Sequence, residues 1–487
     1  MNLSVIFASP EATPFAKTGG LADVAGSLPG ALKALGAKVF IFLPFYRHVA
    51  NSGMEIEPTA LEVTVPIGRR TIKARVLRNS KTEVPAYFIK CDEYYDRTYL
   101  YGTPDGDYFD NIERFAFFSR AVLEAIKAGG FRPDIIHCND WQTGLIPAYL
   151  KDAYKKDEYF SKTATVLTVH NTAYQGVFPP ELYDVLDLSK GLFSPEGLEF
   201  WGSINLLKAG VVFSDAITTV SPGYSREIRT PQYGYGLDGL FNKRGDDLYG
   251  VVNGADYNEW NPSTDPLIPG NYSPDDLSGK GACKRELLKA FDLDLEETTP
   301  VIGMISRLAG QKGFDILAEA MPALMRLNLG IVILGTGETV YRGLIEKLAE
   351  KYPRKLSVKI AFDNTLAHLV EAGSDIFLMP SRYEPCGLNQ LYSMRYGTIP
   401  VVRATGGLDD TVRDFGEEGA TGFKFKEYSA AALASRVKDA LAVFRNKKAW
   451  SKLQKNAMAE DFSWEKSAKN YMEIYRKALK KTEGNFL

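Results

Sequence analysis

Short apolar runs alternate with helix-patterned segments through the second half of the chain, and this alternation restricts the fold more than any other feature. The apolar runs VIGMIS, GIVILG, LSVKIA and IFLM begin at residues 301, 330, 356 and 376. Segments with helical spacing lie between them, at 314–327, 338–351 and 366–372. Such alternation predicts βαβ units, and hence a parallel sheet with right-handed crossovers. The fold class is therefore α/β.

The stretch at 375–413 adds two further strand–loop–helix units. The run IFLM predicts a buried strand, and the turn after it contains Glu384 and Gly387 before a helix at 388–396. A second strand at 399–402 leads through Thr-Gly-Gly into another helix. Ligands of open α/β sheets bind at the carboxyl ends of strands, where helix starts favour an anion. A lone glutamate in such a turn is more often solvated or a helix cap than catalytic.

Two cations, Arg307 and Lys312, lie in the loop that follows the strand at 301–306. Because this loop is also at a strand's carboxyl end, the pair could clamp a diphosphate, with arginine as a fork and lysine as a point charge. For a single cation the default interpretation would be a solvated loop. The same kind of junction, Gly-Thr-Gly, recurs at 335–337.

The first half opens with a strand at 3–8 and a glycine-bearing loop, Lys-Thr-Gly-Gly, that begins a helix at about residue 21. Gly20 lets the backbone approach a ligand, and Lys17 supplies a positive charge. The loop fits neither GxGxxG nor the Walker A pattern, so it does not indicate a dinucleotide or triphosphate. Asp23 could face the crevice or only favour the first turn of the helix. Strand-like alternation at 60–91 predicts an inserted hairpin region, and the tyrosines at 94–101 are better explained as packing.

Two further strands, at 134–137 and 165–169, end in polar residues. His137, Asp140 and His170 are placed at these ends, and the chain has only 4 histidines. A neutral histidine can hydrogen-bond a substrate hydroxyl. For His137 a structural role is equally favoured, whereas for His170 we favour function.

Composition excludes several classes of protein. The 487 residues suffice for two or three domains, and a net charge of −2 does not suggest a nucleic-acid or acidic-membrane partner. No apolar run reaches the roughly 18 residues of a transmembrane helix, and the start of the chain lacks a basic signal region. The 4 cysteines form no CxxC pair, so a disulfide frame or metal site is not expected and a reducing cytoplasm fits.

A tract dense in turn-forming residues, NPSTDPLIPGNYSPDD, follows residue 260 and marks a linker. We place the domain boundary at 253–262. The domains are then predicted at 1–253 and 262–462, followed by a terminal helical piece at 463–487 in which Ser463 could act as an N-cap, as Ser429 could for the helix before it.

Several motifs occur together in order: KTGGLADV, HCNDWQTG, LTVHN, SRLAGQKG, SRYEPCGLNQLYSMRYGTIPVV and TGGLDDTV. With this set the chain resembles the bacterial glycogen synthases and plant starch synthases, glycosyltransferase family 5. The resemblance covers nearly the whole chain. It implies a GT-B architecture, with two Rossmann-like domains facing across a cleft and a last helix that returns to the N-terminal domain. It also implies transfer of glucose from ADP-glucose to the non-reducing end of an α-1,4-glucan, with retention at the anomeric carbon.

The resemblance also implies roles for individual residues. Lys17 and Gly20, with Asp23 beside them, reach the donor from the N-terminal domain, His170 contacts the glucose, and Asp140 lines the cleft. Arg307 and Lys312 bind the diphosphate. The sugar and distal phosphate are held by the side chain of Glu384 and the backbone of Gly387, Leu388 and Asn389.

Many retaining GT-B enzymes carry a second glutamate eight residues after the first, but this chain has Tyr392 there. This agrees with the glycogen and starch synthase pattern. No metal and no cofactor are expected, because cationic side chains can stand in for Mg²⁺. The partners are then a nucleotide sugar and a glucan, with UDP-glucose left open as an alternative donor.

Rival interpretations are a non-catalytic glucan- or nucleotide-binding protein and a phosphorolytic enzyme. The combination of Lys17, His170, Arg307, Lys312 and Glu384 argues against the first. For the second, no recognisable motif for a pyridoxal-phosphate lysine is present. Glu384 is a nucleophile by residue type, although we prefer same-face attack by the acceptor hydroxyl.

Overall fold

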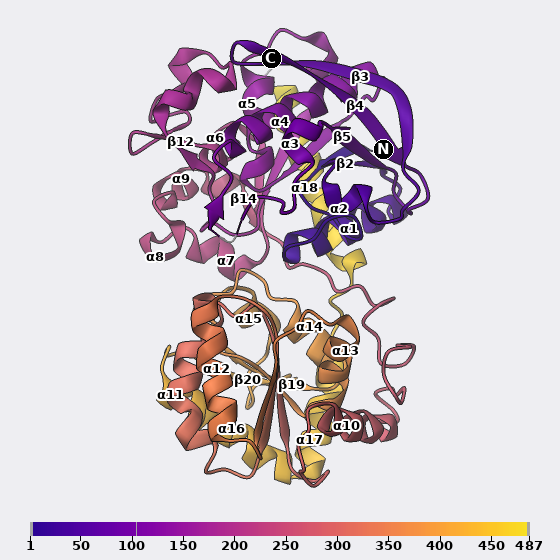
Figure 1. Cartoon of the computed structure of the whole chain (residues 1–487), viewed down its shortest axis with the longest axis vertical. Coiled ribbons are helices and arrows are strands. Elements are labelled where there is room, and N and C mark those ends of the chain that lie inside the picture. The colour runs from indigo at the N-terminus through magenta and orange to yellow at the C-terminus, as the bar shows by residue number, and fades with distance from the viewer. Residues whose placement is uncertain (1–2, 104, 485–487) are drawn as a thin grey trace. The chain divides into compact units, whose positions relative to one another are not determined.

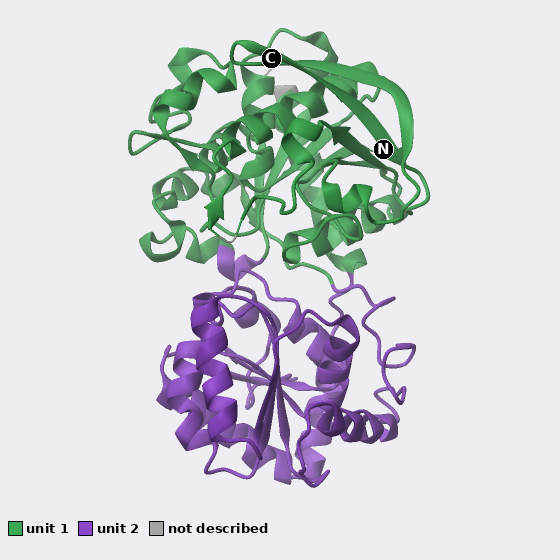
Figure 2. Cartoon of the chain, viewed as in Figure 1, with its two compact units in different colours: residues 1–220, 225–254, 464–487 green, residues 221–224, 255–463 purple. Residues whose placement is uncertain are grey.

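A computed structural model describes residues 3–103 and 105–484 of the chain (Figure 1). The contacts divide it into two compact units, coloured separately in Figure 2. Unit 1 comprises residues 1–220, 225–254 and 464–487, and unit 2 comprises residues 221–224 and 255–463. The sequence-based domain limits remain a prediction, because a division by contacts does not establish which pieces fold independently.

Unit 1 is built on a sheet with the strand order β14-β13-β9-β8-β1-β2-β5-β4-β3. Neighbouring strands are parallel from β14 to β5, whereas β3 and β4 form an antiparallel hairpin at one edge. The predicted strands and the inserted hairpin region are thereby confirmed. The strands are β1 Ser4–Ala8, β2 Lys38–Pro44, β3 Glu57–Ile67, β4 Arg70–Asn79, β5 Ala86–Lys90, β8 Ile135–Asn139, β9 Ala164–Val169, β13 Ala216–Thr219 and β14 Leu248–Gly250.

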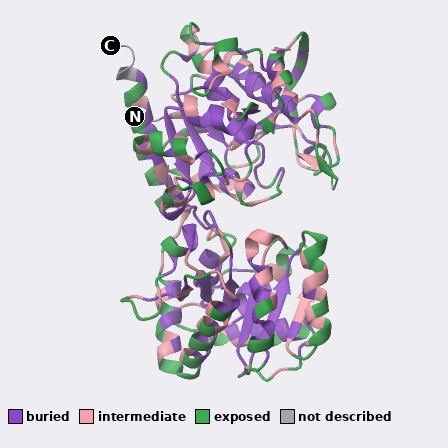
Figure 3. Cartoon of the chain, turned by 90° about the vertical axis from the view of Figure 1, so that its left-hand side faces the viewer, coloured by how far each residue is buried: buried purple, intermediate pink, exposed green. Residues whose placement is uncertain are grey.

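Helices cover this sheet, and the central strands are buried, as Figure 3 shows for both units. The main helices are α1 Gly20–Ala34, α4 Asn111–Ala128, α5 Leu145–Lys151, α6 Leu206–Phe213 and α18 Trp464–Gly484. Short helices join them: α2 Arg47–Ala50, α3 Asp92–Tyr95, α7 Pro222–Glu227, α8 Pro231–Gly234 and α9 Asp238–Lys243. Small antiparallel pieces complete the unit: β6 Gly102–Thr103, β7 Gly106–Asp107, β10 Val177–Phe178, β11 Glu199–Phe200 and β12 Ser203–Asn205.

The sequence pattern predicts a helix at 115–128, and helix α4 begins four residues earlier, at Asn111. The extra turn is polar in sequence but buried in the structure. The fully buried guanidinium of Arg114 donates to the carbonyls of Tyr94 and Leu100 and to the side chain of Asn111. Buried polar groups of this kind are hydrogen-bonded, and their burial leaves no trace in an apolar pattern. Tyr94 and Tyr95 are themselves buried, which confirms that these two are packing residues, whereas Tyr99 is 47% exposed.

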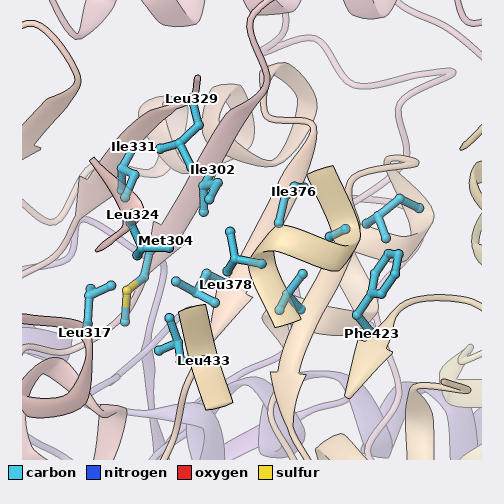
Figure 4. Close-up of a cluster of buried hydrophobic side chains, with 14 of the residues drawn as sticks. Ile302, Met304, Leu317, Leu324, Leu329, Ile331, Ile376, Leu378, Phe423 and Leu433 are labelled. Carbon is cyan, nitrogen blue, oxygen red and sulfur yellow. The ribbon is translucent and has the colours of Figure 1, made fainter. Parts of the chain in front are cut away.

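Unit 2 contains an all-parallel sheet in the order β17-β16-β15-β18-β19-β20, which confirms the predicted βαβ alternation. Apolar side chains from its strands and helices form buried clusters, and part of one cluster is drawn in Figure 4. The strands are β15 Val301–Ile305, β16 Gly330–Leu334, β17 Leu356–Lys359, β18 Ile376–Met379, β19 Ile399–Arg403 and β20 Phe423–Phe425.

The helices of unit 2 are α10 Ser278–Ala290, α11 Phe314–Leu324, α12 Thr339–Lys351, α13 Asn364–Gly373, α14 Asn389–Arg395, α15 Gly406–Thr411, α16 Ala430–Arg445 and α17 Lys447–Met458. Ser429 caps α16 by accepting the N–H of Ala432, as its position predicted. Helices α10 and α17 were not predicted. The reason is clear for α10, which buries two lysine side chains, Lys280 and Lys284, beside its few apolar residues.

All four cysteines are buried and free. Among the described residues, no helix is both long and apolar enough to cross a membrane.

Candidate functional site

The glycine-bearing loop of unit 1 is folded around a buried carboxylate that sequence reasoning missed. Glu11 follows β1 and accepts the backbone N–H of Thr18 and the Thr18 hydroxyl, the latter at 2.6 Å. Its Oε1 also accepts the Tyr101 hydroxyl at 2.6 Å. Glu11 therefore fixes the loop that ends at Gly20, the first residue of α1. Only its place just after a strand could have singled it out in the sequence.

Lys17 and Asp23 form an ion pair, with 2.7 Å between Nζ and Oδ1. The ammonium group is partly exposed, and Asp23 lies in the first turn of α1. Because the lysine is held beside the start of the helix, its charge and the helix N–H groups act on the same region. Asp23 thus orients the side chain of Lys17. The sequence had not indicated that these two residues form a pair.

The ends of β8 and β9 are linked by hydrogen bonds. Asp140 Oδ1 accepts the backbone N–H of His170 at 2.7 Å. Asn139 donates through Nδ2 to the carbonyl of Ala8, so its Oδ1 faces His170 Nε2 at 3.0 Å. The amide oxygen can only accept, and His170 is therefore protonated at Nε2 and carries a lone pair on Nδ1. Burial lowers the pKa of His170 to about 3, so the ring is neutral at pH 7.

Asp140 adopts an unusual conformation for a residue other than glycine, with φ 55° and ψ −172°. Conformations of this kind cost about 1–3 kcal/mol and gather at functional sites. Burial raises its pKa to about 7, the charge of Glu11 adds to the rise, and the N–H of His170 opposes it. The negative charge of Glu11, after β1, therefore acts on the carboxyl group of Asp140, after β8.

His137 differs from its predicted position. Strand β8 continues to Asn139, so His137 lies inside the strand instead of at its end. It is fully buried, with Nδ1 2.7 Å from the Tyr475 hydroxyl and Nε2 2.6 Å from the Thr168 hydroxyl. Burial lowers its pKa to about 3. The structural interpretation, one of the two left open by the sequence, is the one that the contacts support.

In unit 2 the loops after β15 and β18 meet in an ion pair. Lys312 Nζ lies 2.6 Å from Glu384 Oε2, and both side chains are mostly buried. The Ser381 hydroxyl donates to the same oxygen at 3.0 Å. The two loops are also joined through Gln311, whose carbonyl accepts the N–H of Arg382 and whose Nε2 donates to the carbonyl of Tyr383. A carboxylate and an ammonium group are thus fixed together at the carboxyl edge of the sheet.

Arg307 lies in the same loop as Lys312 and is exposed. Across residues 3–103 and 105–484, its guanidinium makes no hydrogen bond or ion pair in the structure. The two cations that were predicted to act together therefore differ in their contacts. Lys312 is fixed by a carboxylate, and Arg307 keeps its donors available for a ligand.

The turn at Gly387, Leu388 and Asn389 leads into α14. Gly387 has φ +74°, a conformation that favours glycine, and a Cβ at this position would lie 2.4 Å from Gln390 Oε1 and displace that amide. The buried amide of Gln390 donates at 3.0 Å to the carbonyls of Cys386 and Gly387. The sequence did not single out Gln390 as a site residue, because its side chain acts by binding backbone carbonyls and belongs to no motif of its own.

Tyr392, which replaces the second glutamate of related enzymes, packs inside unit 2. Its ring stacks on Trp260, with centroids 4.2 Å apart and an interplanar angle of 5°. The other face of Trp260 stacks on His368 at 3.9 Å. This position is therefore occupied by a packing residue that ties the linker to the unit.

In the described ranges of the chain, no three or more His, Cys, Asp or Glu side chains are grouped so that they could hold a metal ion. The expectation that the chain uses no metal or cofactor stays a prediction.

The chain is similar to known proteins over nearly its whole length. Residues 4–243 match the family model of the starch synthase catalytic domain, and residues 288–457 match that of glycosyl transferases group 1. A glycogen synthase from Koribacter versatilis is 47% identical over 480 residues, covering 98% of each chain. A glycogen synthase from Thermotoga maritima is 46% identical over 488 residues, covering 98% of this chain and 99% of the relative.

Solved structures give the same result. The catalytic domain of Arabidopsis thaliana starch synthase IV, bound to ADP and acarbose, aligns with a TM-score of 0.91 at 31% identity and covers 99% of this chain and 100% of its own. Sucrose-phosphate synthase from Thermosynechococcus elongatus, at 18% identity and a TM-score of 0.61 over 98% and 99% of the two chains, shares the fold. The chain is therefore a glycosyltransferase with the GT-B fold. Within that class it belongs to the glycogen and starch synthase family.

Proposed function

We propose that this chain elongates an α-1,4-glucan by transferring glucose from ADP-glucose to the non-reducing end, with retention of configuration and release of ADP. The observation that carries the proposal is the arrangement at the carboxyl ends of β15 and β18. There Lys312 is fixed by Glu384, and Arg307 has its guanidinium available. A diphosphate leaving group needs such a pair of cations.

The residues stabilise charge that develops during the reaction. The bond between the anomeric carbon and the diphosphate breaks, and the electron pair leaves with the phosphate. Arg307, Lys312 and Lys17 stabilise that negative charge, and each such contact is typically worth about 2.7–4 kcal/mol in the transition state. Because these cations and the helix starts serve the leaving group, the proposed reaction needs no metal and no cofactor.

The sugar is positioned by the remaining predicted residues. Glu384 and the backbone of Gly387, Leu388 and Asn389 hold the sugar and distal phosphate, and Gly20 lets the N-terminal loop approach the donor. Neutral His170 offers the lone pair of Nδ1 to a glucose hydroxyl. Asp140 fixes the backbone of His170 and faces the same region.

Retention by a covalent intermediate would require a nucleophilic carboxylate. Glu384 Oε2 already accepts from Lys312 and Ser381, which lowers its nucleophilicity. We therefore favour attack by the acceptor hydroxyl on the face that the leaving group departs from, with the hydroxyl proton passing to the departing phosphate. Mass spectrometric detection of a glucosyl–Glu384 adduct would contradict this route.

The donor is expected to be ADP-glucose, because the related Arabidopsis thaliana structure contains ADP and the motif set is that of ADP-glucose-dependent enzymes. A glucan and a nucleotide sugar are then the partners, and the four free, buried cysteines agree with a reducing cytoplasm.

A turnover assay with purified chain and glycogen tests the proposal. ADP should be released from ADP-glucose only when glycogen is present, and UDP-glucose should give a much lower kcat/KM. Release of ADP without glycogen would indicate hydrolysis. Binding of glycogen without any release would indicate a non-catalytic binding protein, and incorporation from glucose 1-phosphate would indicate a phosphorolytic enzyme.

A further inference from the structure

Unit 1 contains an open groove that the proposed donor site does not use. Its cavity volume is about 370 Å³. The segment 173–178 forms one wall, and Asp107, Trp141 and Tyr235 complete it. The groove adjoins the predicted site in sequence, since Trp141 follows Asp140 and the segment 173–178 follows His170.

The floor of the groove is a rigid aromatic surface. Trp141 packs edge-on against Phe115 at 5.0 Å and lies 5.9 Å from Phe178, measured between ring centroids. Gly176 has φ +62°, and a Cβ there would lie 2.4 Å from the Trp141 ring. Glycine is therefore required for the backbone to lie against the indole.

One buried amide holds the two sides of the groove together. Gln175 Nε2 donates to the carbonyls of Thr172 at 3.0 Å and Tyr235 at 3.1 Å, and Gln175 Oε1 accepts from Asn205 at 2.6 Å. Tyr235 is thereby held in a left-handed conformation with φ 50°. A left-handed conformation costs free energy in a tyrosine. We infer that it is kept because it holds the Tyr235 ring in one orientation.

Two large aromatic side chains that line the groove, Tyr174 and Tyr235, are exposed, and so is Trp201 outside it. Tyr174 is 53% exposed, Tyr235 is 42% exposed and Trp201 is 84% exposed. Trp201 lies at the turn between β11 and β12 with φ 53°, and the turn is fixed by a 2.6 Å hydrogen bond from the N–H of Gly202 to Glu199 Oε1.

Trp201 lies next to the groove. A Cβ at Gly236, the residue after Tyr235, would lie 3.4 Å from Trp201 Nε1. In addition, β12 pairs with β10, whose residues Val177 and Phe178 border the groove. A cluster of exposed aromatic rings on a fixed frame marks a binding surface, whereas single exposed rings do not.

We propose that this groove and Trp201 bind the glucan acceptor at glucose units beyond the one that reacts. The flat C–H faces of glucose rings suit exposed aromatic faces, and the Asp107 carboxylate can accept sugar hydroxyls. The residues that border the groove in the described part of the chain include no lysine or arginine, so the surface does not suit a phosphate backbone. The inference rests on the proposed function and assigns part of its acceptor specificity.

The test compares long and short acceptors with Trp201→Ala and Tyr174→Ala in the full chain. With ADP-glucose as donor, KM for glycogen should rise roughly 3- to 10-fold in each variant, as loss of one aromatic stacking contact predicts. KM for maltose should change less than about twofold in Trp201→Ala, since a two-unit acceptor is too short to use the whole surface. Trp201→Phe should restore most of the glycogen affinity.

Retardation in native gels containing glycogen measures binding without donor or turnover. Val340→Ala, in which an exposed side chain of α12 is shortened, is the control and should migrate like wild type. Wild-type retardation and glycogen KM in both aromatic variants would overturn the groove assignment and leave the proposed function intact. A different result would be glycogen binding that depends on Trp201 in a chain that does not turn over ADP-glucose. That result would refute the proposed function but support the assignment of the groove as a glucan-binding site.

Discussion

At the scale of single residues, unit 2 offers two similar ion pairs at opposite ends of its sheet. Lys312 and Glu384 meet after the carboxyl ends of β15 and β18, with 2.6 Å between them. Lys284 and Asp375 are also 2.6 Å apart, but Asp375 precedes β18 and its Oδ2 accepts the N–H of Val301 at the start of β15. Both pairs are mostly buried. Only the first is at the edge where ligands of such sheets bind.

Lys312→Ala should lower kcat at saturating ADP-glucose by about 100-fold or more, because it removes a cation from the leaving diphosphate. It should also lower the melting temperature, since it leaves the buried Glu384 carboxylate without its cation. The burial of the pair leads us to expect a measurable decrease.

Lys284→Ala is the matched control for that variant. It breaks an equally short pair and should lower the melting temperature by a similar amount. At a temperature well below both transitions its kcat should stay within about twofold of wild type. Equal losses of kcat in the two variants would mean that Lys312 acts only through stability.

The carboxyl group of Asp140 provides a second prediction at this scale. Its pKa is raised from 3.8 to about 7 in the folded chain, mainly by burial. Between these values the folded state keeps a proton that the unfolded state has lost, so this group's contribution to stability falls as pH rises from about 4 to 7. Asp140→Asn keeps an acceptor for His170 but cannot titrate.

The free energy of unfolding should therefore differ between wild type and Asp140→Asn in a pH-dependent way. The difference in the free energy of unfolding, wild type minus variant, should decrease by about 3 kcal/mol between pH 4 and pH 7, as the shift of the Asp140 pKa predicts. Urea unfolding at several pH values measures it. Parallel curves for the two proteins would show that the carboxyl titrates normally.

At the scale of elements, the linker after residue 254 is bound to α13 and α14 of unit 2. Trp260 is stacked between His368 and Tyr392. His368 Nδ1 lies 2.7 Å from Asp265 Oδ2, and the Tyr396 hydroxyl donates to the same oxygen at 2.6 Å. The segment that looked like a loose linker in sequence is thus tied to the unit by a buried charged pair.

The His368 pair makes unit 2 sensitive to alkaline pH. Burial alone would lower the pKa of His368, but the hydrogen bonds and charges of Asp265 and Glu259 outweigh it and raise the pKa from 6.5 to about 9. The stabilisation is complete below pH 6.5 and is lost as pH rises through 9. It amounts to about 3 kcal/mol.

His368→Gln should remove this pH dependence. Between pH 6.5 and 9 the free energy of unfolding of the wild type should decrease relative to the variant, as measured by urea titration followed at Trp260 or by calorimetry. His48→Gln, in the one-turn helix α2 of unit 1, is the control and should leave the slope unchanged. The assignment fails if the wild type and His368→Gln show the same slope.

At the scale of the whole molecule, unit 1 is discontinuous in sequence. Its last helix, α18, packs against α1, β9 and β13 and buries Tyr471 and Tyr475. Tyr475 also contacts the buried ring of His137. Residues 255–463, between the second and third segments of unit 1, carry the complete parallel sheet of unit 2.

This organisation predicts different behaviour for two truncated chains. A chain that ends at residue 463 should lose the cooperative unfolding of unit 1, because the faces of α1 and β9 that α18 covers become exposed. Residues 255–463 alone should fold cooperatively. Calorimetry and hydrogen exchange on both fragments measure this. Retention of the unit 1 transition without α18 would show that the helix is only an accessory.

Local patterns predicted a large part of the fold. Most strands of the two large sheets, the hairpin region and about half of the helices follow from apolar periodicity, which each segment carries by itself. Patterns failed where polar side chains are buried, as in α10 with its two lysines and in the first turn of α4. They also placed His137 at a strand end, because the continuation of β8 into Asn139 is polar.

The candidate site was predicted in the same uneven way. Lys17, Asp140, His170, Arg307, Lys312 and Glu384 were found because their motifs follow strands. Glu11, Ser381 and Gln390 were not, since they hold backbone or other side chains and carry no motif. The roles of the predicted residues remain predictions.

The sequence by itself determined the alternation of strands and helices, the loops that carry charge and the family to which the chain belongs. The tertiary structure decided which charges pair: Lys312 with Glu384, 72 residues further on, and His368 with Asp265, 103 residues earlier. It also decided that α18 joins the first unit and that the linker is bound to the second. Periodicity is a property of neighbouring residues, whereas a pairing between distant side chains exists only once the strands between them have fixed their distance.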